Sequence, residues 1–278
     1  MGVRPHISFS EWGLWKECQW RWMRDYREER RSQIYGVNLE FGKAVHDALE
    51  KFKHPEVEKN LNLSDSCDLF ESKFRSRYIE IRDKDKKPLT DKEIDEWVVA
   101  GRRIIENLHH CGEIEEAQVL FVEYPLMEKI SRTDDVEIKF KGFIDLVIKT
   151  KDKKGKSIVY IIDYKTCSWG WPRAKRQDEH LASQIRLYKH FFSKRFNLDP
   201  RNVKTAFALL KRVAKNPEQT TEFFSISAGP KTVMRAVSNL NSAITGMQSN
   251  DYKKNREVCI NRYGDRCAYY QTDLCLDD

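Results

Sequence analysis

Two apolar stretches of the chain carry the side chains best suited to chemistry. The first, FKGFIDLVIK at 140–149, contains Asp145, and the second, IVYIIDYKT at 158–166, contains Asp163 and Lys165. Successive side chains of a strand point to opposite faces, so Asp163 and Lys165, two residues apart, project from the same face. The polar segment between the two stretches is typical of a hairpin turn.

Pairing of these strands brings the two carboxylates together. In a register that sets Thr150 opposite Ile158, Asp145 lies opposite Asp163. Directly opposed residues lie about 5 Å apart, and two carboxylates at that distance repel each other unless a proton or a cation lies between them. The arrangement therefore predicts a divalent metal ion at this position.

The elements that must position these residues change in type along the chain. Apolar spacings of three, four and seven predict helices at 11–30, 41–53, 67–82 and 91–110, the first capped by Ser8 or Ser10 and the second with Phe52 facing inward. From residue 118 the period approaches two, and further strands are predicted at 204–213 and 221–228. A helix at 178–196 lies between the hairpin and these later strands, and a last helix follows Pro230. This order favours one α/β domain with a mixed sheet over two separable domains.

Composition narrows the classes of function. With 278 residues and 40% hydrophobic residues, the chain can bury a substantial core. A formal net charge of +7 is compatible with binding to nucleic acid. Neither a signal peptide nor a membrane-spanning run is recognisable, which predicts a cytoplasmic protein without a membrane partner. Gly155-Lys156-Ser157 lacks the earlier glycine of a phosphate-binding loop, because residue 150 is threonine.

Four short motifs follow one another along the chain: GKAVH (42–46), GFID (142–145), DYK (163–165) and QIRLY (184–188). Their order resembles the RecB-like branch of the PD-(D/E)xK nuclease superfamily, whose patterns are GxxxH, GxxD, DxK and QxxxY. The resemblance spans residues 8–275. It implies a restriction-endonuclease-like α/β core, a central mixed β-sheet flanked by helices, within one nuclease domain over 1–278. That domain would comprise a mainly helical part (1–117), a catalytic core (118–250) and a Cys-rich tail (251–278) packing near the N-terminal helix.

Site roles follow from this resemblance and from the chemistry of the residues. Asp145 and Asp163 would hold Mg²⁺ or Mn²⁺ with the main-chain carbonyl of Tyr164, and His46 would add a nitrogen ligand that favours Mn²⁺. Glu123 is a further candidate ligand. The alternatives are a partly buried histidine without a ligand role and a surface ion pair formed by the DYK motif.

Lys165 would orient the attacking water or stabilise charge that develops on the phosphate. Gln184 and Tyr188 lie one helical turn apart, and they would contact the DNA backbone or support Lys165. The alternative for Tyr188 is a place in the core.

Seven cysteines include one near the start of the chain, Cys18, and three in the tail, Cys259, Cys267 and Cys275. Many RecB-like nucleases bind a [4Fe–4S] cluster through one N-terminal and three C-terminal cysteines, and the resemblance implies such a cluster here. Four thiolates also suit a structural Zn²⁺ ion, which is the alternative cofactor. Either metal would link the two ends of the chain.

The function implied is that of a metal-dependent DNA exonuclease acting on single- or double-stranded ends in recombination, repair or phage DNA processing. The alternatives are a CRISPR-adaptation-type nuclease that trims DNA ends with a protein partner, and a non-catalytic DNA-binding module. Aromatic and basic residues after the DYK motif are candidates for stacking on bases and binding phosphates, with a place in the core as the alternative for the tryptophans. They are Trp169, Trp171, Arg173, Lys175 and Arg176, with Lys211 and Arg212 as further candidates.

Overall fold

The computed structural model describes residues 5–30, 35–51, 61–85, 87–109, 111, 114, 116–133, 136–249, 251–260 and 266–276, without the side chains of residues 109, 131–133 and 136. Contacts divide the chain into two compact units. Unit 1 comprises Met1–Ile34, Met127–Gly142 and Met234–Asp278, and unit 2 comprises Tyr35–Leu126 and Phe143–Val233. The assignment of residues 1–278 to one nuclease domain stays a prediction.

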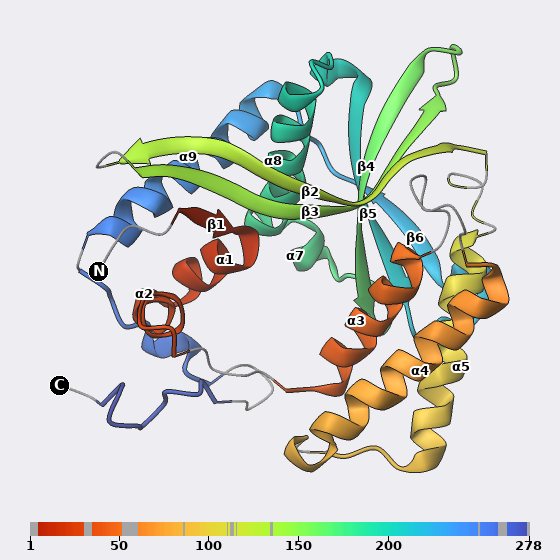
Figure 1. Cartoon of the computed structure of the whole chain (residues 1–278), viewed down its shortest axis with the longest axis horizontal. Coiled ribbons are helices and arrows are strands. Elements are labelled where there is room, and N and C mark those ends of the chain that lie inside the picture. The colour runs from red at the N-terminus through yellow and green to blue at the C-terminus, as the bar shows by residue number, and fades with distance from the viewer. Residues whose placement is uncertain are drawn as a thin grey trace. The chain divides into compact units, whose positions relative to one another are not determined.

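A mixed sheet forms the centre of unit 2 (Figure 1). Strand β3 (Val136–Lys151) pairs with β2 (Gln118–Thr133) and, antiparallel, with β4 (Ser157–Cys167). β4 runs parallel to β5 (Val203–Lys211), which is antiparallel to β6 (Thr221–Ser225). Thr150 lies opposite Ile158, so the predicted register of the hairpin is confirmed.

Three helices of unit 2 pack together against one face of this sheet. They are α3 (Val37–Glu50), α4 (Leu63–Ile81) and α5 (Asp91–His109). Their apolar side chains share one core with alternating residues of the central strands, Ile162 and Tyr164 from β4 and Ala208 and Leu210 from β5. The predicted end of the second helix, including Phe52, lies outside the described residues.

The parallel pair β4 and β5 requires a crossover connection, which α7 (Arg173–Arg176) and α8 (Glu179–Arg195) supply. The carboxylate of Asp178 caps α8 by accepting hydrogen bonds from the N–H groups of His180 and Leu181. α8 packs on β4 and β5. The predicted class, an α/β fold with a central mixed sheet flanked by helices, is confirmed.

Unit 1 contains β1 (His6–Ser8), α1 (Phe9–Glu17), α2 (Gln19–Trp22), a π-helix (Met23–Arg27) and most of α9 (Pro230–Gln248). β1 runs parallel to the segment of β3 at residues 139–141. Trp12, Trp15 and Trp22 are buried, and a Cβ added to Gly246 would lie 2.7 Å from the Trp15 ring, which shows how closely α9 approaches α1. Short 3-10 turns lie at Arg82–Lys84, Pro200–Asn202, Pro217–Gln219 and Arg256–Val258.

The prediction of one continuous helix over 11–30 is wrong. Ser8 caps α1, as one of the two predicted caps, but Cys18 is extended (φ −155°, ψ 112°) and separates α1 from α2. The C-terminal tail occupies the break: the N–H of Trp20 donates to the carbonyl of Lys253, and Asn255 donates to the carbonyl of Glu17. Hydrogen bonds from distant residues therefore replace those that a continuous helix would make.

Within the described part of the chain, none of the helices combines the length and the apolar character that a membrane crossing requires.

Candidate functional site

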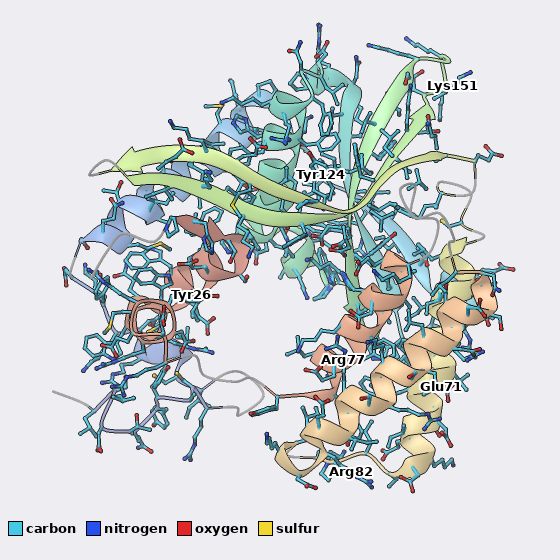
Figure 2. All side chains as sticks on the ribbon, viewed as in Figure 1. Tyr26, Glu71, Arg77, Arg82, Tyr124 and Lys151 are labelled. Atoms are coloured by element: carbon cyan, nitrogen blue, oxygen red, sulfur yellow. The ribbon has the colours of Figure 1, made fainter. Side chains whose placement is uncertain are left out.

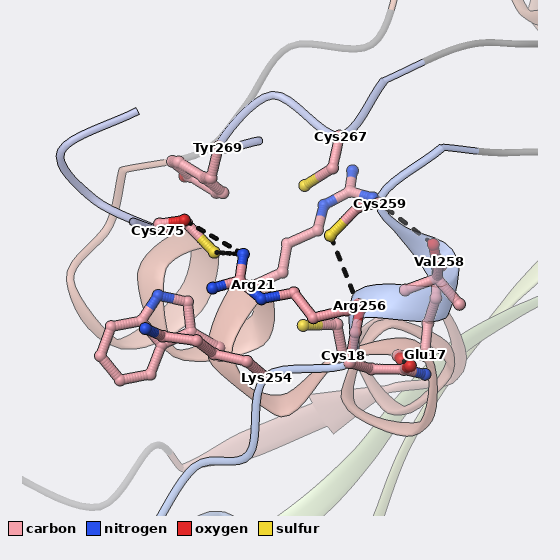
Figure 3. A pocket seen from close by; sticks show the side chains of 12 residues that line it. Glu17, Cys18, Arg21, Lys254, Arg256, Val258, Cys259, Cys267, Tyr269 and Cys275 are labelled. Carbon is pink, nitrogen blue, oxygen red and sulfur yellow. Dashed lines mark hydrogen bonds and ion pairs between the residues drawn. The ribbon is translucent and has the colours of Figure 1, made fainter. Parts of the chain in front are cut away.

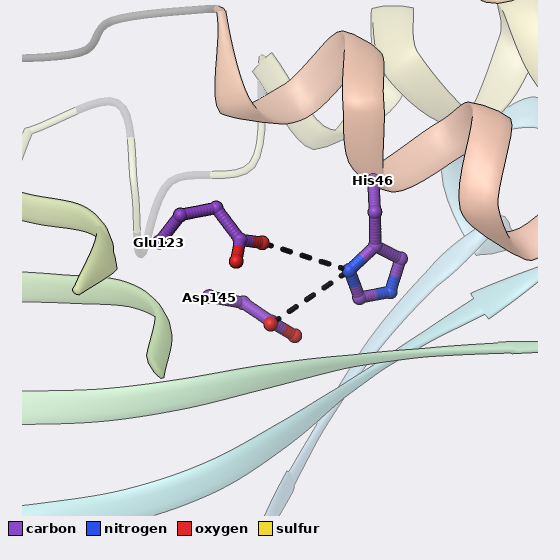
Figure 4. A group of neighbouring side chains, drawn as sticks. All are labelled: His46, Glu123 and Asp145. Atoms are coloured by element: carbon purple, nitrogen blue, oxygen red, sulfur yellow. Dashed lines mark ion pairs between the residues drawn. The ribbon is translucent and has the colours of Figure 1, made fainter. Parts of the chain in front are cut away.

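Three potential metal ligands of unit 2 converge from separate elements (Figure 4). The Nδ1 atom of His46 lies 3.8 Å from Oε1 of Glu123 and 3.7 Å from Oδ1 of Asp145. One ligand atom from each of the three residues lies within 4.8 Å of the other two. The sequence alone named all three, with Glu123 only as a further candidate, because it belongs to none of the four short motifs.

Contacts of α3 with β4 and α4 hold His46 in place. Gly42 faces β4 so closely that a Cβ there would lie 2.9 Å from Oγ1 of Thr166. Arg77, which Figure 2 labels on α4, pairs with Asp47 of α3 at 2.7 Å. The His46 ring meets the ring of Tyr164 edge-on, with 5.8 Å between centroids. The glycine of the GxxxH motif thus serves close helix–strand packing, which sets the height of the histidine above the sheet.

Glu123 has an unusual backbone conformation for a residue within a strand. Its φ of 47° lies in the left-handed region, which non-glycine residues occupy at a cost of about 1–2 kcal/mol. Such a residue interrupts the regular alternation of a strand and redirects its own side chain. Here the side chain points to His46 and Asp145 (Figure 4).

The hairpin of β3 and β4 contributes two buried carboxylates. Asp145 is 7% exposed and Asp163 is 2% exposed. The Tyr164 N–H donates a hydrogen bond to Oδ2 of Asp145 at 2.6 Å, which ties one carboxylate to the opposite strand. The Nζ atom of Lys165 lies 2.6 Å from Oδ2 of Asp163, so the predicted acid–base pair is in contact.

Electrostatics in this group favour a bound cation. Burial, together with the charge of Asp163, raises the pKa of Asp145 to about 8. Burial would by itself lower the pKa of His46, but Glu123, Asp145 and Asp163 outweigh it and raise that pKa. The charges of neighbouring carboxylates contribute to both shifts, and a metal ion would offset their repulsion.

The donor set fits a divalent ion. Carboxylate oxygens suit Mg²⁺ and an imidazole nitrogen suits Mn²⁺. Opposite ligands of an octahedral Mg²⁺ stand about 4.2 Å apart, so donors within 4.8 Å of one another need only small movements. Which residues bind the metal, including the carbonyl of Tyr164, stays a prediction.

Gln184 and Tyr188 lie together on α8. The side-chain amide of Gln184 donates to the hydroxyl of Tyr188 at 3.2 Å. Burial raises the pKa of the Tyr188 hydroxyl, and the charge of Asp163 raises it further, which places this pair beside the acidic group. Tyr188 is 4% exposed, so it is a core residue that also lies next to the site.

The residues predicted to bind DNA separate into two groups. Trp169 is 69% exposed, and Arg173 and Lys175 are also exposed. Trp171, in contrast, is buried against Phe207, with 5.0 Å between ring centroids. Four of the cations contact other side chains of the protein. Arg176 and Lys211 pair with Glu222. Arg212 lies 3.7 Å from the centroid of the Trp97 ring, and Nζ of the exposed Lys175 lies 4.9 Å from that of the Trp171 ring.

Four cysteines of unit 1 line one pocket, although they are distant in sequence (Figure 3). Cys18 comes from the break between α1 and α2, and Cys259, Cys267 and Cys275 come from the tail. No three of their sulfur atoms, all of them in described residues, lie within 4.8 Å of one another.

Cationic side chains lie among these sulfur atoms, as Figure 3 shows for Arg21 and Arg256. Arg256 donates to the carbonyl of Cys275 at 3.1 Å and to its sulfur at 3.5 Å. The pKa of Cys267 is raised on balance, chiefly by burial, while a hydrogen bond from the Tyr269 N–H and the charge of Arg21 limit the rise. Positive charge near a thiol favours the thiolate, which is the form that binds metals.

Comparison with known families agrees with the geometry of the site. The sequence model described as the PD-(D/E)XK nuclease superfamily matches residues 6–272. The chain belongs to this superfamily. Members are metal-dependent nucleases, so the family implies a divalent metal and a DNA substrate. No curated protein matches the chain.

Proposed function

We propose that the protein is a DNA exonuclease of the RecB-like branch, with its active site on β2, β3, β4, α3 and α8. The observation that carries the proposal is the convergence of His46, Glu123 and Asp145 beside the contact between Asp163 and Lys165. Family membership supports a metal-dependent nuclease, and the repulsion between the buried carboxylates supports a cation at this point.

In this proposal His46, Glu123, Asp145 and Asp163 would hold Mg²⁺ or Mn²⁺, joined by the carbonyl of Tyr164. The metal would supply an activated water and neutralise charge on the phosphate. The Tyr164 N–H fixes one oxygen of Asp145 and leaves the other free to face the metal.

Lys165 would act on the water or on the phosphate. Its contact with Asp163 holds the ammonium group beside the acidic cluster, where it can donate a hydrogen bond to the attacking oxygen. The hydrogen bond between Gln184 and Tyr188 would keep both side chains oriented toward the DNA backbone or toward Lys165.

Action on DNA ends, in recombination, repair or phage DNA processing, rests on the resemblance of the four motifs to RecB-like nucleases. A CRISPR-adaptation-type nuclease that trims ends with a protein partner is the second candidate. The third candidate is a non-catalytic DNA-binding module. Such a module would have no need of an acid, a base and a histidine grouped at one point.

The test is cleavage of linear and covalently closed circular DNA, each single- and double-stranded, with Mg²⁺ or Mn²⁺. We expect loss of linear DNA only, abolished by EDTA and by Lys165→Ala. Lys156→Ala, which removes an exposed lysine from the turn between β3 and β4, is the matched control and should cleave normally. Cleavage of closed circles would replace the exonuclease assignment with an endonuclease, and no cleavage with either metal would favour the binding module.

We further propose that Cys18, Cys259, Cys267 and Cys275 bind a [4Fe–4S] cluster. A zinc ion with Zn–S bonds of 2.3 Å requires sulfur atoms about 3.8 Å apart at tetrahedral angles. A cubane is wider and separates its cysteines further. The separation of the sulfur atoms, with no three within 4.8 Å, supports the cluster over zinc.

The cluster proposal is tested on protein purified without oxygen. We expect a brown protein with about four iron atoms and four sulfides per chain, and loss of colour in Cys18→Ser. Cys67→Ser is the control, because Cys67 is buried in the core of unit 2, and it should leave the colour unchanged. One zinc per chain in place of iron would overturn the proposal.

A further inference from the structure

Among the described residues that follow the DYK motif, Trp169 is the most exposed large hydrophobic side chain. It is 69% exposed, while Trp171, two residues later, is 5% exposed. Exposure of so much aromatic surface gives up the stabilisation that burial would provide. The exposed ring face is therefore open to a partner outside the protein.

The backbone on either side of Trp169 is fixed. Before it, the carbonyls of Cys167 and Ser168 accept hydrogen bonds from the N–H groups of Arg212 and Val213, each at 2.8 Å. These bonds extend the pairing of β4 with β5 up to the residue that precedes the tryptophan.

The segment after Trp169 is anchored too. The Trp171 ring packs on Phe207. The main-chain carbonyl of Trp171 accepts a hydrogen bond from Nε of Arg176 at 2.8 Å. Arg176 and Lys211 pair with Glu222 of β6, at 2.6 Å and 2.7 Å. Gly170, with φ 115°, makes the sharp turn between the exposed and the buried tryptophan. A fixed backbone presents the Trp169 ring without a large loss of entropy on binding.

This segment adjoins the proposed active site through one shared neighbour. The Phe207 ring lies 5.7 Å from Nζ of Lys165 and 5.0 Å from the Trp171 ring. Trp169 follows Lys165 by four residues on the continuation of the same strand. Trp169 thus belongs to the segment that directly follows the proposed active site in the chain.

The flanking charges suit a nucleic acid. Arg173 and Lys175 are exposed in α7, directly after the anchored turn. Within the described residues the Arg173 guanidinium is in no hydrogen bond or ion pair, so it is available to a phosphate. The Lys175 ammonium lies 4.9 Å from the centroid of the Trp171 ring, beside the anchored turn. An aromatic face beside cationic side chains is the combination that binds single-stranded DNA.

We propose that Trp169 stacks on an unstacked base of the DNA strand that enters the active site, with Arg173 on an adjoining phosphate. This inference rests on the proposed nuclease function and specifies its substrate. Bases within a duplex already stack on both faces, so only a single-stranded or frayed end offers a free face to the tryptophan. The enzyme therefore prefers single-stranded ends over blunt duplex ends.

Binding is measured in EDTA, which prevents cleavage, with a fluorescently labelled single strand and a blunt duplex of the same sequence. Loss of one aromatic stacking contact weakens binding about 5- to 150-fold. We expect this loss for Trp169→Ala with the single strand and no change with the duplex. Trp169→Phe keeps an aromatic face and should retain most of the affinity. Ile79→Ala, at a residue 71% exposed on α4, is the control for loss of exposed apolar surface.

Cleavage assays separate this inference from the function on which it rests. Trp169→Ala should raise KM for single-stranded DNA and leave kcat unchanged, because stacking contributes equally to the ground state and the transition state. If the wild-type protein cleaves DNA but Trp169→Ala binds both DNAs as tightly as the wild type, the stacking proposal is overturned and the nuclease stands. Equal weakening for both DNAs overturns the preference for single strands. If the wild type cleaves nothing, the proposed function fails whatever Trp169 binds.

Discussion

Gly42 offers the most direct test of how α3 positions His46. A Cβ at this residue would lie 2.9 Å from Oγ1 of Thr166, closer than an ordinary contact between carbon and oxygen. Threonine is stiff at χ1, so Gly42→Ala must move α3 away from β4. Overpacking of this kind costs about 1–3 kcal/mol, and the better helix propensity of alanine returns up to about 1 kcal/mol. We expect a net loss of about 1 kcal/mol in the free energy of unfolding.

When Thr166 is already alanine, Gly42→Ala should increase the free energy of unfolding instead of lowering it. Without Oγ1 the added methyl group meets no close atom of this side chain, and Gly42→Ala keeps the gain in helix propensity of about 0.5–1 kcal/mol. The coupling free energy between the two sites is then about 1–3 kcal/mol. Thr166→Val is the matched control, because valine keeps the volume of threonine and should retain the conflict.

The assay is urea unfolding followed by circular dichroism in EDTA, combined with Mn²⁺ titration of each variant. Gly42→Ala should weaken Mn²⁺ binding in the wild-type background, since the shift of α3 carries His46 with it, and Thr166→Ala should restore that binding. Equal effects of Gly42→Ala in all three backgrounds would refute the close packing of α3 on β4. A change in stability without any change in Mn²⁺ affinity would refute the link to His46.

Two further predictions concern the acidic cluster. In the folded protein without metal, Asp145 has a pKa of about 8, raised from the ordinary value of 3.8. Asp145 therefore loses its proton at lower pH in the unfolded chain than in the folded protein. The stability of the metal-free protein should therefore fall as pH rises from about 4 to 8, while the affinity for Mn²⁺ rises about tenfold per unit as Asp145 deprotonates. Thermal unfolding with and without Mn²⁺ at several pH values measures both trends, and identical profiles for wild type and Asp145→Asn would contradict the assignment. Glu123 occupies the left-handed region at φ 47°. In urea unfolding, Glu123→Gly should therefore be more stable than Glu123→Ala by about 1 kcal/mol in the free energy of unfolding. Both variants should weaken Mn²⁺ binding equally. Equal stabilities of the two variants would show that the backbone is not strained.

Much of the fold could be predicted because it depends on local periodicity. The apolar runs and the polar turn between them predicted the hairpin of β3 and β4, and the pairing of Thr150 with Ile158 is present. The helix predicted at 178–196 is present as Glu179–Arg195, begun by the cap at Asp178. Each signal lies within about ten residues of the feature that it specifies, so one sequence is enough to read it.

The parts that escaped prediction depend on distant residues. The break at Cys18 is stabilised by Lys253 and Asn255, more than 230 positions away, and no local pattern encodes that contact. β1 is three residues long and acquires its strand conformation by pairing with residues 139–141 of β3. The burial of Trp171 likewise follows from Phe207 on the neighbouring strand.

The two backbone irregularities of greatest consequence lie at residues proposed to bind metals. Cys18 leaves the helical conformation that its neighbours adopt, and Glu123 leaves the extended conformation of its strand. In both cases a regular element would direct the side chain elsewhere, since helices and strands fix side-chain direction by their period. Departures of this kind cost free energy and are retained where the rest of the fold imposes them. Regularity in the sequence thus predicts the scaffold, and the points where the backbone departs from that regularity identify the residues that the scaffold presents.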